Sequence, residues 1–134
     1  MKNSPPIVGT TYQTVLGAVI TSFRSSASNE PIKQADIAAA IGVTVSTWSR
    51  IERGESSISL DQLILATKFL NIKLSVLFEE VENITTQLLE NGVKVTVDKN
   101  TKNSWGMQLS NTQLIGLSIL TGSSIGLFAA SAMN

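Results

Sequence analysis

The stretch QADIAAAIGVTVSTWSRIERG, residues 34–54, decides the fold, because it predicts two short helices joined by a tight turn. Ile37 and Ile41 give the first helix an apolar face at helical spacing. Gly42 is expected to end that helix, since glycine adopts a positive φ without steric penalty. Thr44 can cap the second helix through its hydroxyl. The stretch therefore predicts a helical hairpin.

The second helix of this pair has two faces of different character. Trp48 and Ile51 are expected to point inward, three residues apart. The opposite face carries short side chains and one long cation, in the order Val45, Ser46, Thr47, Ser49 and Arg50. An uncrowded polar helix face of this kind fits the DNA major groove, whose base edges offer donors, acceptors and methyl groups.

This pattern resembles the lambda-repressor/Cro-type, or XRE, family of helix-turn-helix proteins. The resemblance rests on Gln34, Ala38, Gly42, Trp48, Ile51, Glu52 and Gly54, and the string SRIERGESSISLDQLILATKFLNI at residues 49–72 continues it. It implies an all-α fold with a five-helix DNA-binding domain. It also implies a transcriptional regulator that acts as a repressor-like homodimer on double-stranded DNA. The alternative interpretation is an ordinary helical hairpin.

The resemblance also implies roles for individual residues. Arg50 is expected to contact a guanine through its forked guanidinium, and Gln34 matches a family position that contacts phosphate and braces the recognition helix. An Arg24–Glu52 ion pair is expected to tie the first helix to the third, the alternative being two solvated charges. The expected DNA-binding residues are Lys33, Gln34, Thr44, Val45, Ser46, Thr47, Ser49, Arg50, Arg53 and Ser56. For the serines the alternative is simple solvation, and for Arg53 it is capping of a helix end.

Composition excludes several classes of function. The chain of 134 residues has no net charge and contains neither cysteine nor histidine. It therefore has no disulfide, and no Ser-His-Asp nucleophile can form. We expect no enzyme, no cofactor and no metal site. The absence of cysteine is compatible with a protein that resides in a reducing cytoplasm. Lys33, Arg50 and Arg53 form a local basic group in an otherwise neutral chain.

The ends of the helical domain follow from local signals. Residues 1–9 predict a flexible arm, and residues 10–90 predict the helix-turn-helix domain, with its first helix capped by Thr10 or Thr11. Ser59 is expected to cap a fourth helix over residues 60–70, whose inward face consists of Leu60, Leu63, Ile64, Thr67 and Leu70. An apolar stripe on an extended fifth helix predicts either a dimer seam or packing on the C-terminal part of the chain; it consists of Leu77, Phe78, Val81, Ile84 and Leu88.

In residues 91–110 the apolar side chains recur at every second residue, in contrast to the helical spacing of the preceding segment. Val93, Val95 and Val97 alternate with polar residues, and a second alternation includes Trp105 and Leu109. We interpret this segment as a β-hairpin. Two strands alone are marginal, so the hairpin needs a partner surface on the fifth helix, a second subunit or a membrane.

Residues 111–134 predict a hydrophobic C-terminal helix. The run 114–133 has no charged residue and is long enough to span a bilayer. Lysines precede it and none follows, which favours tethering to the cytoplasmic face of the inner membrane. The alternative is a tightly packed helix of a soluble oligomer. A second functional hypothesis follows, in which the helical domain is a membrane-anchored protein-interaction module or an antitoxin-like protein.

Overall fold

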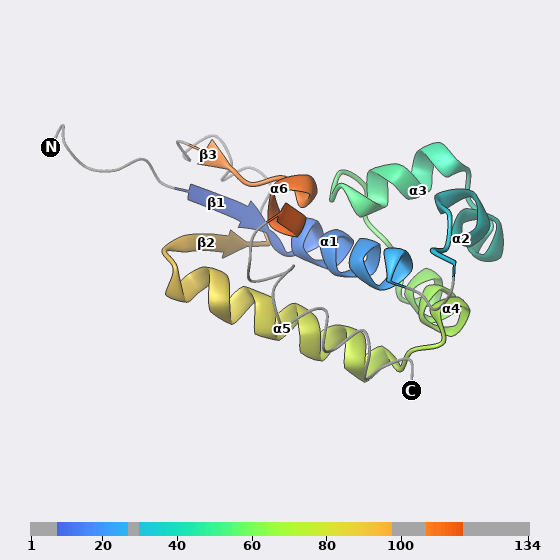
Figure 1. Ribbon diagram of the computed structural model, residues 1–134. Helices are drawn as coiled ribbons and strands as arrows, with labels where there is room; N and C mark the ends of the chain where they lie inside the picture. The colour runs from blue at the N-terminus through green and yellow to red at the C-terminus, as the bar shows by residue number, and fades with distance from the viewer. Residues whose placement is uncertain (1–7, 27–29, 98–106, 117–134) are drawn as a thin grey trace, which may run out of the picture.

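The computed structural model describes residues 8–26, 30–97 and 107–116, which form a mostly helical fold with one small sheet (Figure 1). The elements in chain order are β1 (Val8–Thr11), α1 (Tyr12–Ser25), α2 (Gln34–Ile41), α3 (Val45–Glu52), α4 (Leu60–Leu70), α5 (Leu74–Glu90), β2 (Val93–Thr96), β3 (Met107–Gln108) and α6 (Asn111–Gly116). The sheet lies at one end of the molecule and α2, α3 and α4 at the other. Helices α1 and α5 run between the two ends.

Side-chain caps set where the helices begin. The Thr11 hydroxyl accepts a hydrogen bond from the Thr14 amide at 3.1 Å, so α1 begins as predicted. Thr44 caps α3 in the same way, and Ser59 forms a reciprocal capping box with Gln62 at the start of α4. Gly42 follows α2 with a φ of 85°, which confirms the predicted turn.

The core lies where α1 crosses the helical hairpin and α5. Its largest fully buried side chains include Phe23 of α1, Trp48 of α3 and Leu77 of α5. The predicted inward face of α4 holds for Leu63, Thr67 and Leu70 but is wrong for Leu60, whose side chain is 61% exposed. Leu60 is the first residue of α4, and the inward stripe begins one turn later, with Leu63.

The sheet differs from the predicted hairpin. Its strand order is β2-β1-β3, and β1 pairs in parallel with both neighbours. Val8 lies opposite Val93 on one side and opposite Met107 on the other. The hairpin prediction for residues 91–110 is therefore wrong, because the two strands flank β1 instead of pairing with each other. Since the chain contains this sheet, the all-α prediction describes only its helical part.

The predicted arm over residues 1–9 is wrong at its C-terminal end, because Val8 and Gly9 belong to the central strand β1. Residues 1–7 lie outside the described residues. The pairing with β2 and β3 extends the folded domain in the N-terminal direction, past the predicted boundary at residue 10.

Strand β2 and helix α6 cover the long helices. β2 packs against α5, so the fifth helix is a partner surface for the strands, as one of the three predicted alternatives proposed. Along the predicted stripe of α5, Leu77, Ile84 and Leu88 are fully buried within the chain, whereas Phe78 is 43% exposed.

Helix α6 packs on α1 and buries Leu114 completely. The Thr10 hydroxyl donates to the Leu109 carbonyl at 2.9 Å and joins β1 to the segment that leads into α6. The predicted helix over 111–134 is described only as far as Gly116, and the rest of the uncharged run lies outside the described residues. None of the helices in the described ranges is both long and apolar enough to cross a membrane.

Candidate nucleic-acid interface

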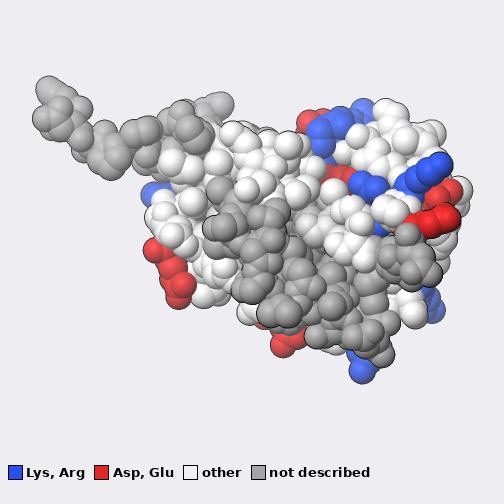
Figure 2. All heavy atoms as spheres, in the orientation of Figure 1, with Lys and Arg blue, Asp and Glu red and all other residues white. Residues whose placement is uncertain are grey.

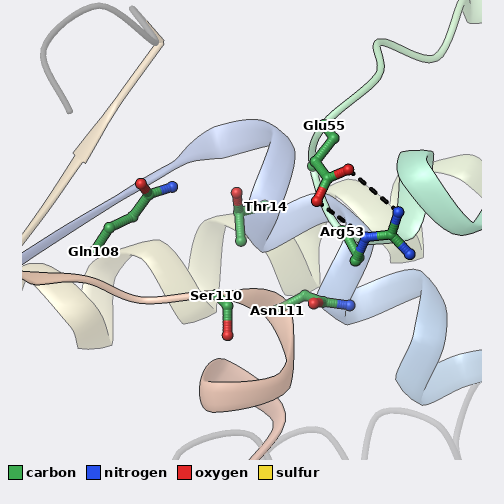
Figure 3. Close-up of a pocket in the computed structure, with 7 residues that line it drawn as sticks. Thr14, Arg53, Glu55, Gln108, Ser110 and Asn111 are labelled. Carbon is green, nitrogen blue, oxygen red and sulfur yellow. Dashed lines mark hydrogen bonds and ion pairs between the residues drawn. The ribbon is translucent and has the colours of Figure 1, made fainter. Parts of the chain in front are cut away.

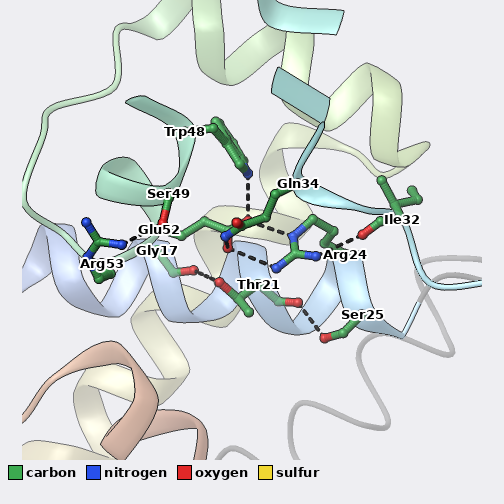
Figure 4. A network of polar contacts seen from close by, with 10 residues as sticks. All are labelled: Gly17, Thr21, Arg24, Ser25, Ile32, Gln34, Trp48, Ser49, Glu52 and Arg53. Carbon is green, nitrogen blue, oxygen red and sulfur yellow. Dashed lines mark hydrogen bonds and ion pairs between the residues drawn. The ribbon is translucent and has the colours of Figure 1, made fainter. Parts of the chain in front are cut away.

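The inner side of α3 is held by a buried carboxylate. Glu52 is 2% exposed, and its two oxygens accept hydrogen bonds from three side chains (Figure 4). Oε2 accepts from Arg24 Nε at 2.7 Å and from Trp48 Nε1 at 2.7 Å. Oε1 accepts from Arg24 Nη2 at 2.9 Å and from Gln34 Nε2 at 2.8 Å. One carboxylate thereby joins α1, α2 and α3.

The Arg24–Glu52 pair confirms the predicted tie between the first and third helices. Arg24 also donates from Nη1 to the Ile32 carbonyl at 2.8 Å, which fixes the chain just before α2. Trp48 and Gln34 were not predicted as partners of Glu52. The four-residue spacing from Trp48 to Glu52 is the signal that could have found one of them, because residues so spaced share a helix face.

Two glycines allow α1 and the end of α3 to touch through their backbones. A β-carbon at Gly17 would lie 2.1 Å from the Glu52 carbonyl oxygen. A β-carbon at Gly54 would lie 2.5 Å from the Thr14 hydroxyl oxygen, and Gly54 has a φ of 75°. The C-terminal end of α3 is therefore seated directly on the first turns of α1.

The outer side of α3 faces solvent. Val45 is 47% exposed although it is apolar, and Ser46 and Arg50 are exposed beside it. Thr47 and Ser49 are partly exposed on the same helix, and Thr44 is exposed at its cap. Arg50 lies within 3.5 Å of the Thr47 hydroxyl, so the long cation lies along the helix. The polar flank expected to meet DNA is not covered by other segments of the described chain.

The remaining predicted site residues surround this flank. Lys33 is exposed at the start of α2, and Gln34 is half-buried because its amide points to Glu52. Arg53, directly after α3, donates through two nitrogens to the Glu55 carboxylate at 3.0 and 3.2 Å. Ser56 follows in the same loop and is partly exposed. Figure 2 shows basic side chains interspersed with acidic ones over the α2–α3 end of the face in view.

A comparison with protein-family models shows what this arrangement is. The model described as helix-turn-helix matches residues 32–77. These residues are a helix-turn-helix domain of the lambda-repressor/Cro type. The match supports DNA binding by this helix-turn-helix domain, with α3 in the position of the second, recognition helix. Helix α1, the sheet and α6 lie outside the matched residues. Searches of curated proteins and of solved structures found no match.

Proposed function

We propose that the protein is a sequence-specific transcriptional regulator that reads the DNA major groove with α3. The observation that carries this proposal is the division of α3 into two sides. Its inner side is fixed by the Glu52 hydrogen bonds, while its outer side leaves Val45, Ser46 and Arg50 exposed. A rigid helix with a free polar flank loses little conformational entropy when base edges bind it.

Each residue of the flank has a distinct role in this proposal. Arg50 binds a guanine with two guanidinium N–H groups, and Val45 contacts a thymine methyl group. Ser46, Thr47 and Ser49 form hydrogen bonds to bases or phosphates. These contacts would give the sequence preference.

A second group of residues would hold the sugar-phosphate backbone. Lys33 and the first turn of α2 supply a cation and free backbone amides. Gln34 uses one amide hydrogen on Glu52, which leaves the second for a phosphate. Arg53 and the loop around Ser56 hold the DNA backbone at the other end of α3.

We further propose that the regulator binds as a homodimer to a palindromic site. Large apolar side chains remain exposed on the two helices that follow α3. Leu65 and Phe69 lie one turn apart on α4, and Phe78 lies on α5, with exposures of 45%, 40% and 43%. A second copy that covers them would place two recognition helices about one DNA turn apart.

Selection of bound duplexes from a random pool tests this proposal. The full chain should enrich one motif with an inverted repeat, and its affinity should fall steeply as salt rises, because phosphate contacts release counterions. Folded protein that enriches no motif would contradict the proposal.

The alternative function is a protein-interaction module tethered by the uncharged run 114–133. The exposed apolar side chains of α4 and α5 favour it, since they suit a protein partner as well as a second copy. Salt dependence distinguishes the two, because apolar protein contacts do not weaken in proportion to phosphate number.

A further inference from the structure

Trp48 binds the same carboxylate as the two neighbouring helices, but it does so from within α3. Its indole Nε1 donates to Glu52 Oε2 at 2.7 Å, one helical turn further along the chain. The ring of Trp48 is fully buried, and Glu52 is 2% exposed. The ring therefore cannot touch DNA, and any effect of its N–H group on DNA binding has to pass through Glu52.

The Glu52 side chain connects α3 to two other helices, and its own direction decides how firmly it does so. Glu52 is the last residue of α3, and several rotatable bonds separate its carboxylate from the helix backbone. Arg24 of α1 and Gln34 of α2 fix where the carboxylate lies. The angle of α3 around its own axis still depends on the rotamer of Glu52. The hydrogen bond from Trp48 holds that rotamer, because it ties the carboxylate to a second point of the same helix (Figure 4).

A second polar cluster at the end of α3 is less suited to orient the helix. Arg53 donates to Glu55 and to the Ser49 hydroxyl, so these bonds join α3 to the loop that follows it. Figure 3 shows the Arg53–Glu55 pair beside a polar hollow that Thr14 and Asn111 also line. The two partners of this ion pair are 45% and 54% exposed, and exposed ion pairs hold a geometry weakly. The buried hydrogen bonds to Glu52 are better placed to set the orientation of α3.

We propose that Trp48 is a positioning residue for base recognition, because its N–H group fixes the Glu52 side chain and thereby the rotation of α3 relative to α1 and α2. This role rests on the proposed DNA-binding function and deepens it. A bidentate contact from Arg50 to a guanine needs both of its N–H groups to point in defined directions. A phosphate contact depends mainly on charge and carries no sequence information of its own. Loss of the Trp48 N–H group should therefore lower sequence discrimination and spare non-specific binding.

Removal of the indole N–H group without a change of shape tests this role. In the full chain, β-(3-benzothienyl)alanine at residue 48 keeps the bicyclic ring but has sulfur in place of the donor nitrogen, and Trp48→Phe removes the donor together with part of the ring. Both changes should weaken binding to the selected operator about tenfold and alter affinity for a random-sequence duplex by less than about twofold. The ratio of the two affinities is the readout, since a loss of folded protein would lower both affinities in proportion.

Leu88→Ala is the matched control for a general loss of stability. Leu88 is fully buried near the end of α5 that leads into the sheet, whereas α3 lies at the other end of the molecule (Figure 1). Its truncation should destabilise the core and keep the wild-type ratio of operator to random-sequence affinity. A wild-type ratio in the benzothienyl variant, or an equal fall of the ratio in Leu88→Ala, would overturn the positioning role.

The hydrogen bond itself can be measured without DNA. In a proton–nitrogen correlation spectrum of the wild-type full chain, the Trp48 indole N–H resonance should lie downfield of that of free tryptophan. Glu52→Gln should move it upfield, because a carboxylate is a stronger acceptor than an amide. A wild-type resonance at the position of free tryptophan would overturn the proposal even if the chain selects an operator. If the resonance is downfield but no motif is enriched, the proposed DNA-binding function is wrong, and the positioning role fails with it.

Discussion

Gly17 of α1 lies directly against the backbone carbonyl of Glu52, so close that a β-carbon at residue 17 would be 2.1 Å from the carbonyl oxygen. The neighbouring Ile51 carbonyl oxygen would be 2.9 Å from the same carbon. Both contacts are to backbone, which cannot move aside as a flexible side chain can. The angle of the recognition helix on α1 therefore depends on the absence of a side chain at residue 17.

Gly17→Ala should lower the free energy of unfolding by about 1–3 kcal/mol, because the added methyl group forces α3 away from α1. Urea unfolding measures the change. Gly116→Ala is the control, since a β-carbon there meets no atom within 4 Å. Equal stability of the two variants would show that α1 and α3 are less tightly packed than described.

Glu52→Gln should lower the free energy of unfolding by about 3–5 kcal/mol, because it leaves the Arg24 guanidinium, which is 14% exposed, without its counter-charge. Glu55→Gln makes the same chemical change in an exposed ion pair and should shift stability by less than about 1 kcal/mol. Thermal unfolding of both variants compares the two pairs. A similar small effect at both positions would argue against a structural role for the Glu52 network.

Arg50→Ala should weaken binding to the selected operator by about 1–3 kcal/mol and relax preference at one base pair. Lys33→Ala, at a proposed phosphate contact, should weaken binding to all sequences alike and reduce the salt slope by about one. Fluorescence anisotropy with operator and single-base variants separates the two results. The base-contact assignment fails if Arg50→Ala keeps the selectivity of the wild type.

Because of the buried carboxyl group of Glu80, we expect the free energy of unfolding to depend on pH. It is fully buried on α5, and within the described part of the chain neither carboxylate oxygen has a hydrogen bond of good geometry. Burial raises the pKa of Glu80 from 4.5 to about 7, against a smaller lowering by the Asn83 side chain and with a still smaller increase from the charge of Glu79. Because the folded state holds this proton more tightly than the unfolded chain, the stabilisation is complete below pH 4.5 and is lost as the pH rises through about 7.

Glu80→Gln should remove this dependence and should be more stable than the wild type at about pH 8, since the amide is neutral at every pH. Chemical unfolding at about pH 5 and about pH 8 measures both proteins. Parallel pH profiles of wild type and variant would show that Glu80 does not titrate in this range.

The part of the uncharged run 114–133 that follows α6 predicts that the full chain fractionates with membranes. A chain ending at Gly116 keeps α6 and the buried Leu114, so it should fold and remain in the soluble fraction. Cell fractionation followed by immunoblotting compares the two. Recovery of the full chain in the soluble fraction would contradict the anchor.

Local signals in the sequence were sufficient for the helical hairpin and its caps. Gly42, Thr44 and Ser59 act within one helical turn, so their roles could be predicted from neighbours alone. The Arg24–Glu52 pair joins distant residues and was predicted only through the family resemblance. The predicted DNA contacts of residues such as Arg50 remain predictions, although α3 leaves them accessible.

The sheet could not be predicted in the same way. Alternation at Val93 and Val95 indicates a strand but carries no information on its partner or direction. The partner, Val8–Thr11, follows two prolines and has only four residues, so its pattern resembles a loop. Parallel pairing also needs a long connection, here the whole helical domain, which no local signal reveals.

The central place of β1 has a consequence for synthesis on the ribosome. Val8 cannot pair on either side of its strand until Val93 and Met107 have been translated. The five helices between them need no such delay, because their caps and most of their contacts are already available. We therefore expect the nascent chain to carry a folded helix-turn-helix domain while its first strand is still unpaired. Completion of the sheet should then be the last and slowest step of folding.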